Sequence, residues 1–77
     1  MKQIIKEQVV AFLKEYNRVC GRQMIVKFGE KDCIISGEDI FSSTFLLMFD
    51  EAFPAKPFEF YFGVRGTSIY MCLYKKS

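Results

Sequence analysis

The sequence predicts an α+β fold, in which an N-terminal helix packs on an antiparallel sheet built from two β-hairpins. Apolar residues recur with a helical period near the N-terminus, and two later stretches alternate with the period of a strand around short turns. The 77 residues suffice for one small domain, 1–77. A core of this size supplies a net stability of only about 3–5 kcal/mol, and small domains often add a second subunit.

Residues 3–20 are expected to form the helix. Its apolar residues follow one another at steps of three or four, and so share one side: Ile5, Val9, Phe12 and Tyr16. Gly21 follows where a left-handed C-cap is expected. The opposite side mixes Lys and Glu, which favours a helix packed on a sheet over a basic helix on a membrane surface.

Residues 23–28 and 33–36 predict the first hairpin, with its turn at 29–32. If Phe28 pairs with Cys33, alternate residues of the two strands form one apolar face. The opposite face is then only half polar and carries Ile25, Lys27 and Ile34.

The segment from about residue 40 to 53 fits two structures. Its apolar residues match a helical stripe that Pro54 would end. Three residues could cap such a helix: Ser42, Ser43 or Thr44. However, the unbroken apolar run 45–49 matches a central strand equally well, because periodicity does not separate the two. The segment is therefore a second helix or a fifth strand.

Residues 58–74 predict the second hairpin, which turns at Arg65-Gly66 or Gly66-Thr67. In both registers one face is wholly apolar and carries Phe58, Phe60, Phe62, Val64, Ile69, Met71 and Leu73. The N-terminal helix is expected to cover this face. The second face carries tyrosines where a sheet that meets water is normally polar, so it predicts a surface that a partner covers.

The predicted partner-binding residues belong to this second hairpin: Tyr61, Arg65, Tyr70, Tyr74 and Lys75. Lys75 and Lys76 extend its last strand. Tyrosine and arginine are enriched at protein interfaces, and stacked aromatic rings beside basic groups also hold single-stranded nucleic acid. The net charge of only +2 and the presence of Glu59 on this face favour a protein contact.

No catalytic or cofactor motif stands in the sequence. The chain has no His, so a serine or cysteine nucleophile lacks its usual base, and the glycines form no phosphate-binding motif. Cys20, Cys33 and Cys72 lack paired metal-ligand spacing and are interpreted as reduced, buried thiols. We therefore expect no enzyme activity, cofactor, metal or small-molecule substrate. The acidic residues, including Asp39, Asp50 and Glu59, are interpreted as solvated loop and cap residues rather than a magnesium site.

These observations favour a non-enzymatic protein-binding module or inhibitor that uses the aromatic sheet face for homodimerisation or target contact. The charged N-terminal segment predicts neither a signal peptide nor a membrane span, and with the free thiols it suggests a cytoplasmic protein. Small chains without catalytic motifs are typical of accessory factors, including phage-encoded inhibitors of host protein complexes. The frequent Phe, Ile and Lys would suit an AT-rich genome.

Two alternatives stay open. The first is a single-stranded nucleic-acid-binding protein that stacks bases on the tyrosines. The second is a small, metal-independent ribonuclease toxin, for which Tyr61, Arg65 and Lys75 would supply the groups that His usually provides.

Overall fold

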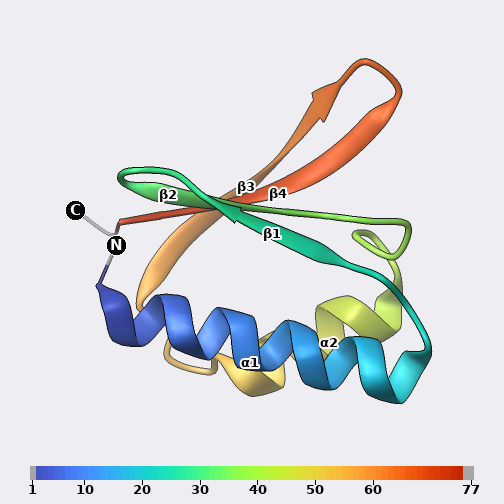
Figure 1. Cartoon of the computed structure of the whole chain (residues 1–77), viewed down its shortest axis with the longest axis horizontal. Coiled ribbons are helices and arrows are strands. Elements are labelled where there is room, and N and C mark those ends of the chain that lie inside the picture. Colours follow the sequence, from blue (N-terminus) through green and yellow to red (C-terminus); the bar gives the residue numbers. More distant parts are fainter. Residues whose placement is uncertain (1, 76–77) are drawn as a thin grey trace.

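The computed structural model describes residues 2–75 of the chain. Its elements in chain order are α1 (Gln3–Cys20), β1 (Ile25–Phe28), β2 (Asp32–Ser36), α2 (Ser43–Ala52), β3 (Phe58–Arg65) and β4 (Ser68–Lys75). The strands form one antiparallel sheet in the order β1-β2-β4-β3. Both helices lie on the same side of this sheet (Figure 1). The α+β fold predicted from the sequence is therefore confirmed.

The end of α1 is joined to the start of β1. Gly21 caps the helix with a φ of 64°, the left-handed conformation expected there. The Asn17 side chain donates to the Met24 carbonyl and accepts from the Met24 backbone N–H, both at 2.9 Å. The side-chain amide thus satisfies both backbone groups of Met24, which lies just before β1.

The middle segment is a helix, α2. Ser42 caps its N-terminus by accepting a hydrogen bond from the Phe45 backbone N–H at 3.0 Å. The helix ends before Phe53 and Pro54. Phe45 and Phe49, one turn apart, are both buried, so the helical form puts these two large rings on the same side against the core.

Both hairpins have registers that the sequence predicted. Phe28 lies opposite Cys33 in the first hairpin. In the second, Arg65 lies opposite Ser68 across a two-residue turn. Gly66 occupies the first turn position with a φ of 63°, as a type II′ turn requires. One of the two registers left open by the sequence is thereby selected.

The second helix, rather than the first, provides the ring contacts to β3. The Phe49 ring of α2 lies 5.8 Å from the Phe58 ring and 5.7 Å from the Phe60 ring, measured between centroids. Phe12 of α1 packs instead on the aromatic side chains of α2, including Phe45 at 5.6 Å. The expectation that α1 covers the apolar face of the second hairpin is wrong in this respect.

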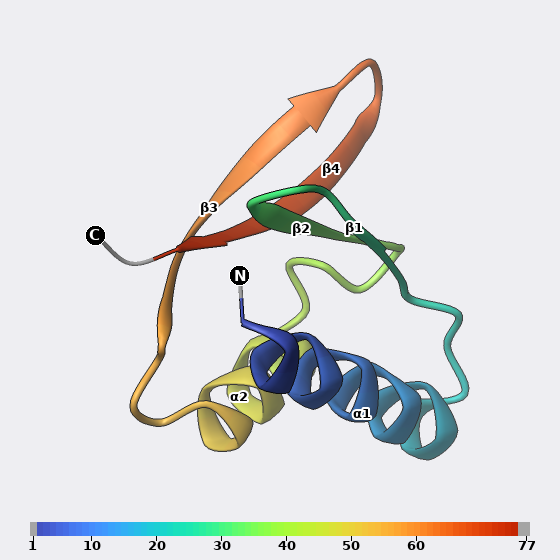
Figure 2. The same cartoon turned by 60° about the vertical axis from the view of Figure 1, so that its left-hand side comes forward.

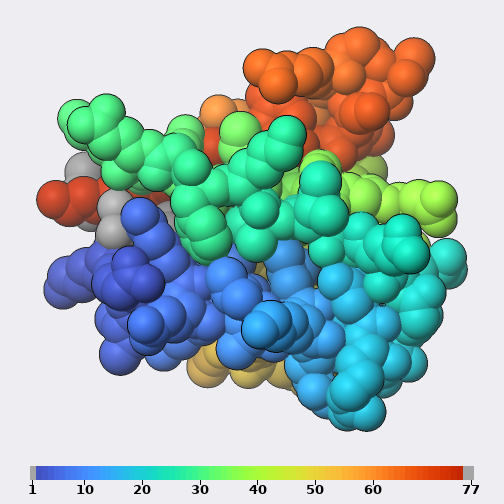
Figure 3. Space-filling view, viewed as in Figure 1, coloured from blue at the N-terminus to red at the C-terminus, as the bar shows by residue number. Residues whose placement is uncertain are grey.

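The apolar face of the second hairpin is only partly covered. Phe58, Met71 and Leu73 are buried, as expected. Phe60 and Phe62, expected to be buried with them, remain 37% and 36% exposed. The strands of this hairpin have eight residues each, and its turn extends away from both helices (Figures 1 and 3). The helices therefore cover the near half of this hairpin and leave its outer half open.

Candidate functional site

The sheet surface opposite the helices is here called the tyrosine face. No helix lies on this surface in the part of the chain that the structure describes (Figure 2). Strand pairing aligns its side chains in rows across the sheet. One row is Lys27, Ile34, Cys72 and Tyr61; a second is Ile25, Ser36, Tyr70 and Gly63; a third is Asp32, Tyr74 and Glu59.

The three tyrosines of this face differ in their packing. The Tyr61 ring is half exposed and lies 5.8 Å from the Tyr74 ring between centroids. The Tyr70 ring lies over Gly63, where a Cβ atom would collide with it. Gly63 therefore provides space for this ring on the neighbouring strand, an arrangement in which an aromatic ring covers a strand glycine. Cys72 lies between Tyr70 and Tyr74 on β4, opposite Tyr61 of β3, and is buried.

Two carboxylates flank one tyrosine. Tyr74 lies opposite Asp32 on β2 and opposite Glu59 on β3. Loss of hydration, followed by the effect of Glu59, raises the pKa of Tyr74. Contact with the Cys72 thiol is the main cause that raises the pKa of Tyr61. Both phenols are therefore neutral at pH 7 and able to donate hydrogen bonds to a partner.

The predicted basic residues do not gather beside the tyrosines. Arg65 lies on the tyrosine face but at the hairpin turn, four residues from Tyr61 along the strand, or about 13 Å. Lys75 lies opposite Phe58 and therefore belongs to the helix side of the sheet. Lys76 is outside the described residues. The structure thus brings Tyr61, Tyr70 and Tyr74 onto one surface and separates Arg65 and Lys75 from each other.

The first hairpin adds five side chains to this face that were not among the predicted site residues: Ile25, Lys27, Asp32, Ile34 and Ser36. The sequence placed three of them on one side of the first hairpin, but it did not show which side of the second hairpin they would join. The pairing of β2 with β4 puts them on the same side of the sheet as the tyrosines. Asp32 was interpreted as a turn residue, whereas it is the first residue of β2.

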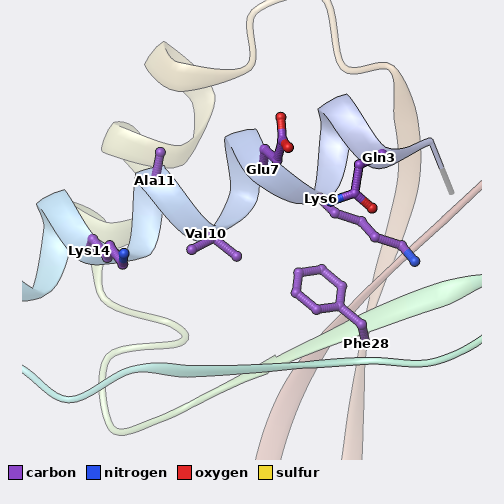
Figure 4. Close-up of a pocket in the computed structure, with 7 residues that line it drawn as sticks. All are labelled: Gln3, Lys6, Glu7, Val10, Ala11, Lys14 and Phe28. Atoms are coloured by element: carbon purple, nitrogen blue, oxygen red, sulfur yellow. The ribbon is translucent and has the colours of Figure 1, made fainter.

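A groove lies between α1 and the edge strand β1 and has a volume of about 520 Å³. Figure 4 shows Phe28 facing α1 across this groove, with the Lys6 ammonium nitrogen 5.7 Å from the ring centroid. Lys14 and Glu7 also line it. Its charged side chains are of both signs and all come from α1, so the groove shows no convergent set of catalytic groups.

Several other polar side chains make structural contacts. The Tyr16 hydroxyl donates to Asp39, whose carboxylate also pairs with Arg22 at 3.1 Å. Asp50 pairs with Lys56. Asp39, Asp50 and Glu59 therefore belong to different environments. Among residues 2–75, no three potential metal ligands form a cluster.

The thiols of Cys33 and Cys72 are buried on opposite sides of the sheet, whereas Cys20, at the end of α1, is only partly buried, and the expectation that it is buried is wrong. Cys33 lies opposite Leu73 and Cys72 lies opposite Ile34, so the two cysteines point to different faces. Burial is the main cause that raises the pKa of Cys33 to about 11. Its thiol is therefore protonated at pH 7 and acts as a small apolar side chain.

No protein family, curated protein or solved structure matches this chain. Neither helix in the described part of the chain combines the length and the apolar character that crossing a membrane requires.

Proposed function

We propose that the chain is a non-enzymatic protein-binding module whose tyrosine face contacts a target protein. One observation carries this proposal: the face is left without a covering layer although it bears three tyrosines and two isoleucines. Tyrosine offers a large contact area at low cost in conformational entropy, together with a hydroxyl for directed hydrogen bonds. A sheet surface that met only water would favour short polar or charged side chains in these positions.

The charges on the face favour a protein over a nucleic acid as the partner. Asp32 and Glu59 flank Tyr74, and their carboxylates would repel the phosphates of a strand stacked on its ring. Lys27 and Arg65 balance these two charges without forming a continuous basic track. A mixed surface of this kind suits the polar rim of a protein interface.

The ribonuclease alternative lacks a convergent set of groups. Tyr61 and Arg65 are about 13 Å apart along β3, and Lys75 is on the opposite side of the sheet. General acid–base catalysis requires such groups within hydrogen-bond reach of one substrate. A factor that occupies another protein's surface needs none of them. An accessory or inhibitory role in the cytoplasm, including that of a phage-encoded inhibitor of a host complex, is part of this proposal.

The test is affinity capture from cells of the native host, followed by a binding measurement with the purified partner. Tyr61→Ala/Tyr70→Ala should weaken binding by about tenfold or more, because interface tyrosines are frequent hot spots. The matched control is Val19→Ala/Leu47→Ala, which removes two exposed apolar side chains of the helices and should leave binding unchanged. Circular dichroism establishes that each variant is folded.

Two results would contradict the proposal. Equal loss of binding in the helix control would show that the tyrosine face is not the contact surface. Retention of a single-stranded oligonucleotide at low salt, abolished in the tyrosine variant and declining steeply with salt, would instead establish the nucleic-acid alternative. Metal-independent RNA cleavage by the pure chain would establish the ribonuclease alternative.

A further inference from the structure

The outer edge of β3 presents unpaired backbone groups. β3 is the last strand in the sheet order, and β4 is its only neighbour among the described residues. None of the backbone hydrogen bonds outside the helices and strands of residues 2–75 involves this strand. In Figure 2, no other element covers the outer side of β3 along the projecting half of the hairpin. Its N–H and C=O groups are therefore free to pair with another strand.

The composition of β3 does not protect this edge. Natural edge strands are commonly short, or carry lysine or proline, which discourages pairing with another chain. The opposite edge, β1, has four residues and contains Lys27. β3 has eight residues, no proline or lysine, and charged side chains only at Glu59 and Arg65.

The side chains along β3 are also unusually apolar for an exposed strand. Phe60, Phe62 and Val64 point to the helix side, and Val64 is 70% exposed. The Phe62 ring contacts Phe41 at 4.6 Å, but both rings remain partly exposed. An exposed apolar patch of this kind next to an open strand edge is typical of a protein-interaction site.

We propose that β3 pairs antiparallel with β3 of a second copy of this chain, so that two four-stranded sheets form one continuous sheet. Opposed residues of an antiparallel pair share a face. A two-fold axis at Phe62 therefore places the tyrosine faces of both copies on one side and all four helices on the other. In this register Phe62 lies opposite itself and Phe60 lies opposite Val64 of the second copy.

Charge complementarity selects this register. With the axis at Phe62, Glu59 lies opposite Arg65 of the second copy, and two-fold symmetry forms this pair twice. Moving the axis to Tyr61 would place Glu59 opposite Gly63 and leave Arg65 without a charged partner in the pairing. The chosen register also extends the row of Asp32, Tyr74 and Glu59 by one guanidinium group.

This inference concerns an edge of the sheet and does not depend on the function proposed for its face. The exposed apolar rings of β3 would contact one another across the axis, which adds side-chain burial to the backbone hydrogen bonds. The tyrosine faces would meet edge to edge and present one larger surface to a target. A dimer formed by this route is therefore compatible with target binding.

A charge-reversal series tests the register. The dimer dissociation constant of the full chain is measured by sedimentation over a concentration series. Glu59→Arg and Arg65→Glu should each weaken dimerisation by about tenfold, because each substitution places two like-charged pairs directly opposite each other. The double variant Glu59→Arg/Arg65→Glu restores opposite charges and should recover most of the affinity. A monomeric wild type, or single and double variants of equal affinity, would overturn the proposed pairing.

A cysteine cross-link tests the position of the axis. Phe62→Cys should form a covalent dimer under mild oxidation, because the two Cα atoms would lie about 4.5–5.5 Å apart. Val64→Cys is the matched control and should not cross-link to its own counterpart, since it lies opposite Phe60 in this register. The wild type gives the background of the native thiols. Equal cross-linking of both folded variants, or none in either, would contradict the assignment.

A second tyrosine variant separates this inference from the proposed function. Tyr70→Ala/Tyr74→Ala, in which both substitutions lie on β4 and not on the pairing strand, should lose the target and keep the dimer. If that variant loses the dimer and the charge reversals have no effect, the chain self-associates through the tyrosine face. This result would overturn pairing through β3.

Discussion

At the residue scale, the Tyr16 hydroxyl links α1 to the loop that precedes α2. Its ring is fully buried, while its hydroxyl donates to Asp39, which Arg22 also contacts. The sequence indicated that Tyr16 belongs to the apolar side of the helix. It could not show the hydrogen bond, because the carboxylate is 23 residues away in the chain.

Tyr16→Phe should lower the free energy of unfolding by about 1.5–3 kcal/mol, the usual contribution of a hydrogen bond to a charged group. The ring and its packing are retained, so the change isolates the hydroxyl. Urea denaturation monitored by circular dichroism measures the difference. Tyr70→Phe is the control, since its hydroxyl takes part in none of the side-chain hydrogen bonds found among residues 2–75 and its loss should cost little. Equal effects of the two substitutions would contradict a structural role for the Tyr16 hydroxyl.

The same variant has a pH signature. Burial, followed by the hydrogen bond to Asp39, raises the pKa of Tyr16 above its ordinary value of 10.0. The folded state therefore holds this proton more tightly than the unfolded state. The resulting stabilisation is complete below pH 10 and is lost as the pH rises through the folded pKa. As the pH rises through this range, the urea concentration at the midpoint of unfolding should decrease. The decrease should be smaller in Tyr16→Phe, because phenylalanine has no hydroxyl to ionise.

At the scale of single elements, α2 shows where local signals sufficed and where they did not. Three residues could have capped a helix, and the structure uses Ser42. The apolar run of this segment was ambiguous because both a buried strand and a buried helix favour it. The choice depends on packing. In a strand Phe45 and Phe49 would share a face but lie about 13 Å apart, whereas in the helix they are one turn apart and both rings contact Phe12 of α1.

Ser42→Ala should destabilise the domain by about 1 kcal/mol, because it removes the acceptor for the Phe45 backbone N–H. Ser43→Ala is the matched control: this residue is the first of the helix, and the substitution should be nearly neutral. Thermal unfolding distinguishes them, since 1 kcal/mol corresponds to a shift of about 4–8 °C in a domain of this size. A larger loss of stability in Ser43→Ala would show that Ser43, and not Ser42, caps the helix.

The two hairpins could be predicted because the sequence signals that specify a hairpin lie within the hairpin itself. Alternation and turn residues gave the register of β1 with β2 and the two faces of β3 and β4. The pairing of β2 with β4 joins residues about 40 positions apart, and no local pattern specifies it. That pairing placed Asp32 beside Tyr74 and thereby determined the charge of the candidate site. It also shows why the tyrosines and Glu59 could be assigned to one face from the sequence, while their neighbours on the first hairpin could not.

At the scale of the whole molecule, the aromatic core lies between α1 and α2 and reaches the sheet at the base of the second hairpin. Phe58 is 2% exposed and contacts both Phe49 and Phe53. Phe60, two residues further along the strand, is more than one third exposed. The sequence did not distinguish these two positions, because both have the same parity in the strand.

Phe58→Ala should therefore cost about 3–5 kcal/mol, most of the stability of a domain of this size, and leave the chain largely unfolded. At concentrations where the chain is monomeric, Phe60→Ala should cost clearly less, because part of its ring then contacts water. Far-UV circular dichroism and urea denaturation of the two variants compare these positions directly. A more severe effect at Phe60 would show that the outer half of the hairpin is covered in solution, as pairing through β3 would provide.

The two borders of the sheet are unequal, and this limits how far the molecule can grow. Pairing of two copies through β3 occupies the long, unprotected edge of both sheets. The opposite edge, β1, is short and carries Lys27, so it does not offer a comparable template for a third chain. Addition of strands would then stop at a pair instead of continuing into a fibre. A substitution that removes the positive charge at position 27 would be the place to look for filaments.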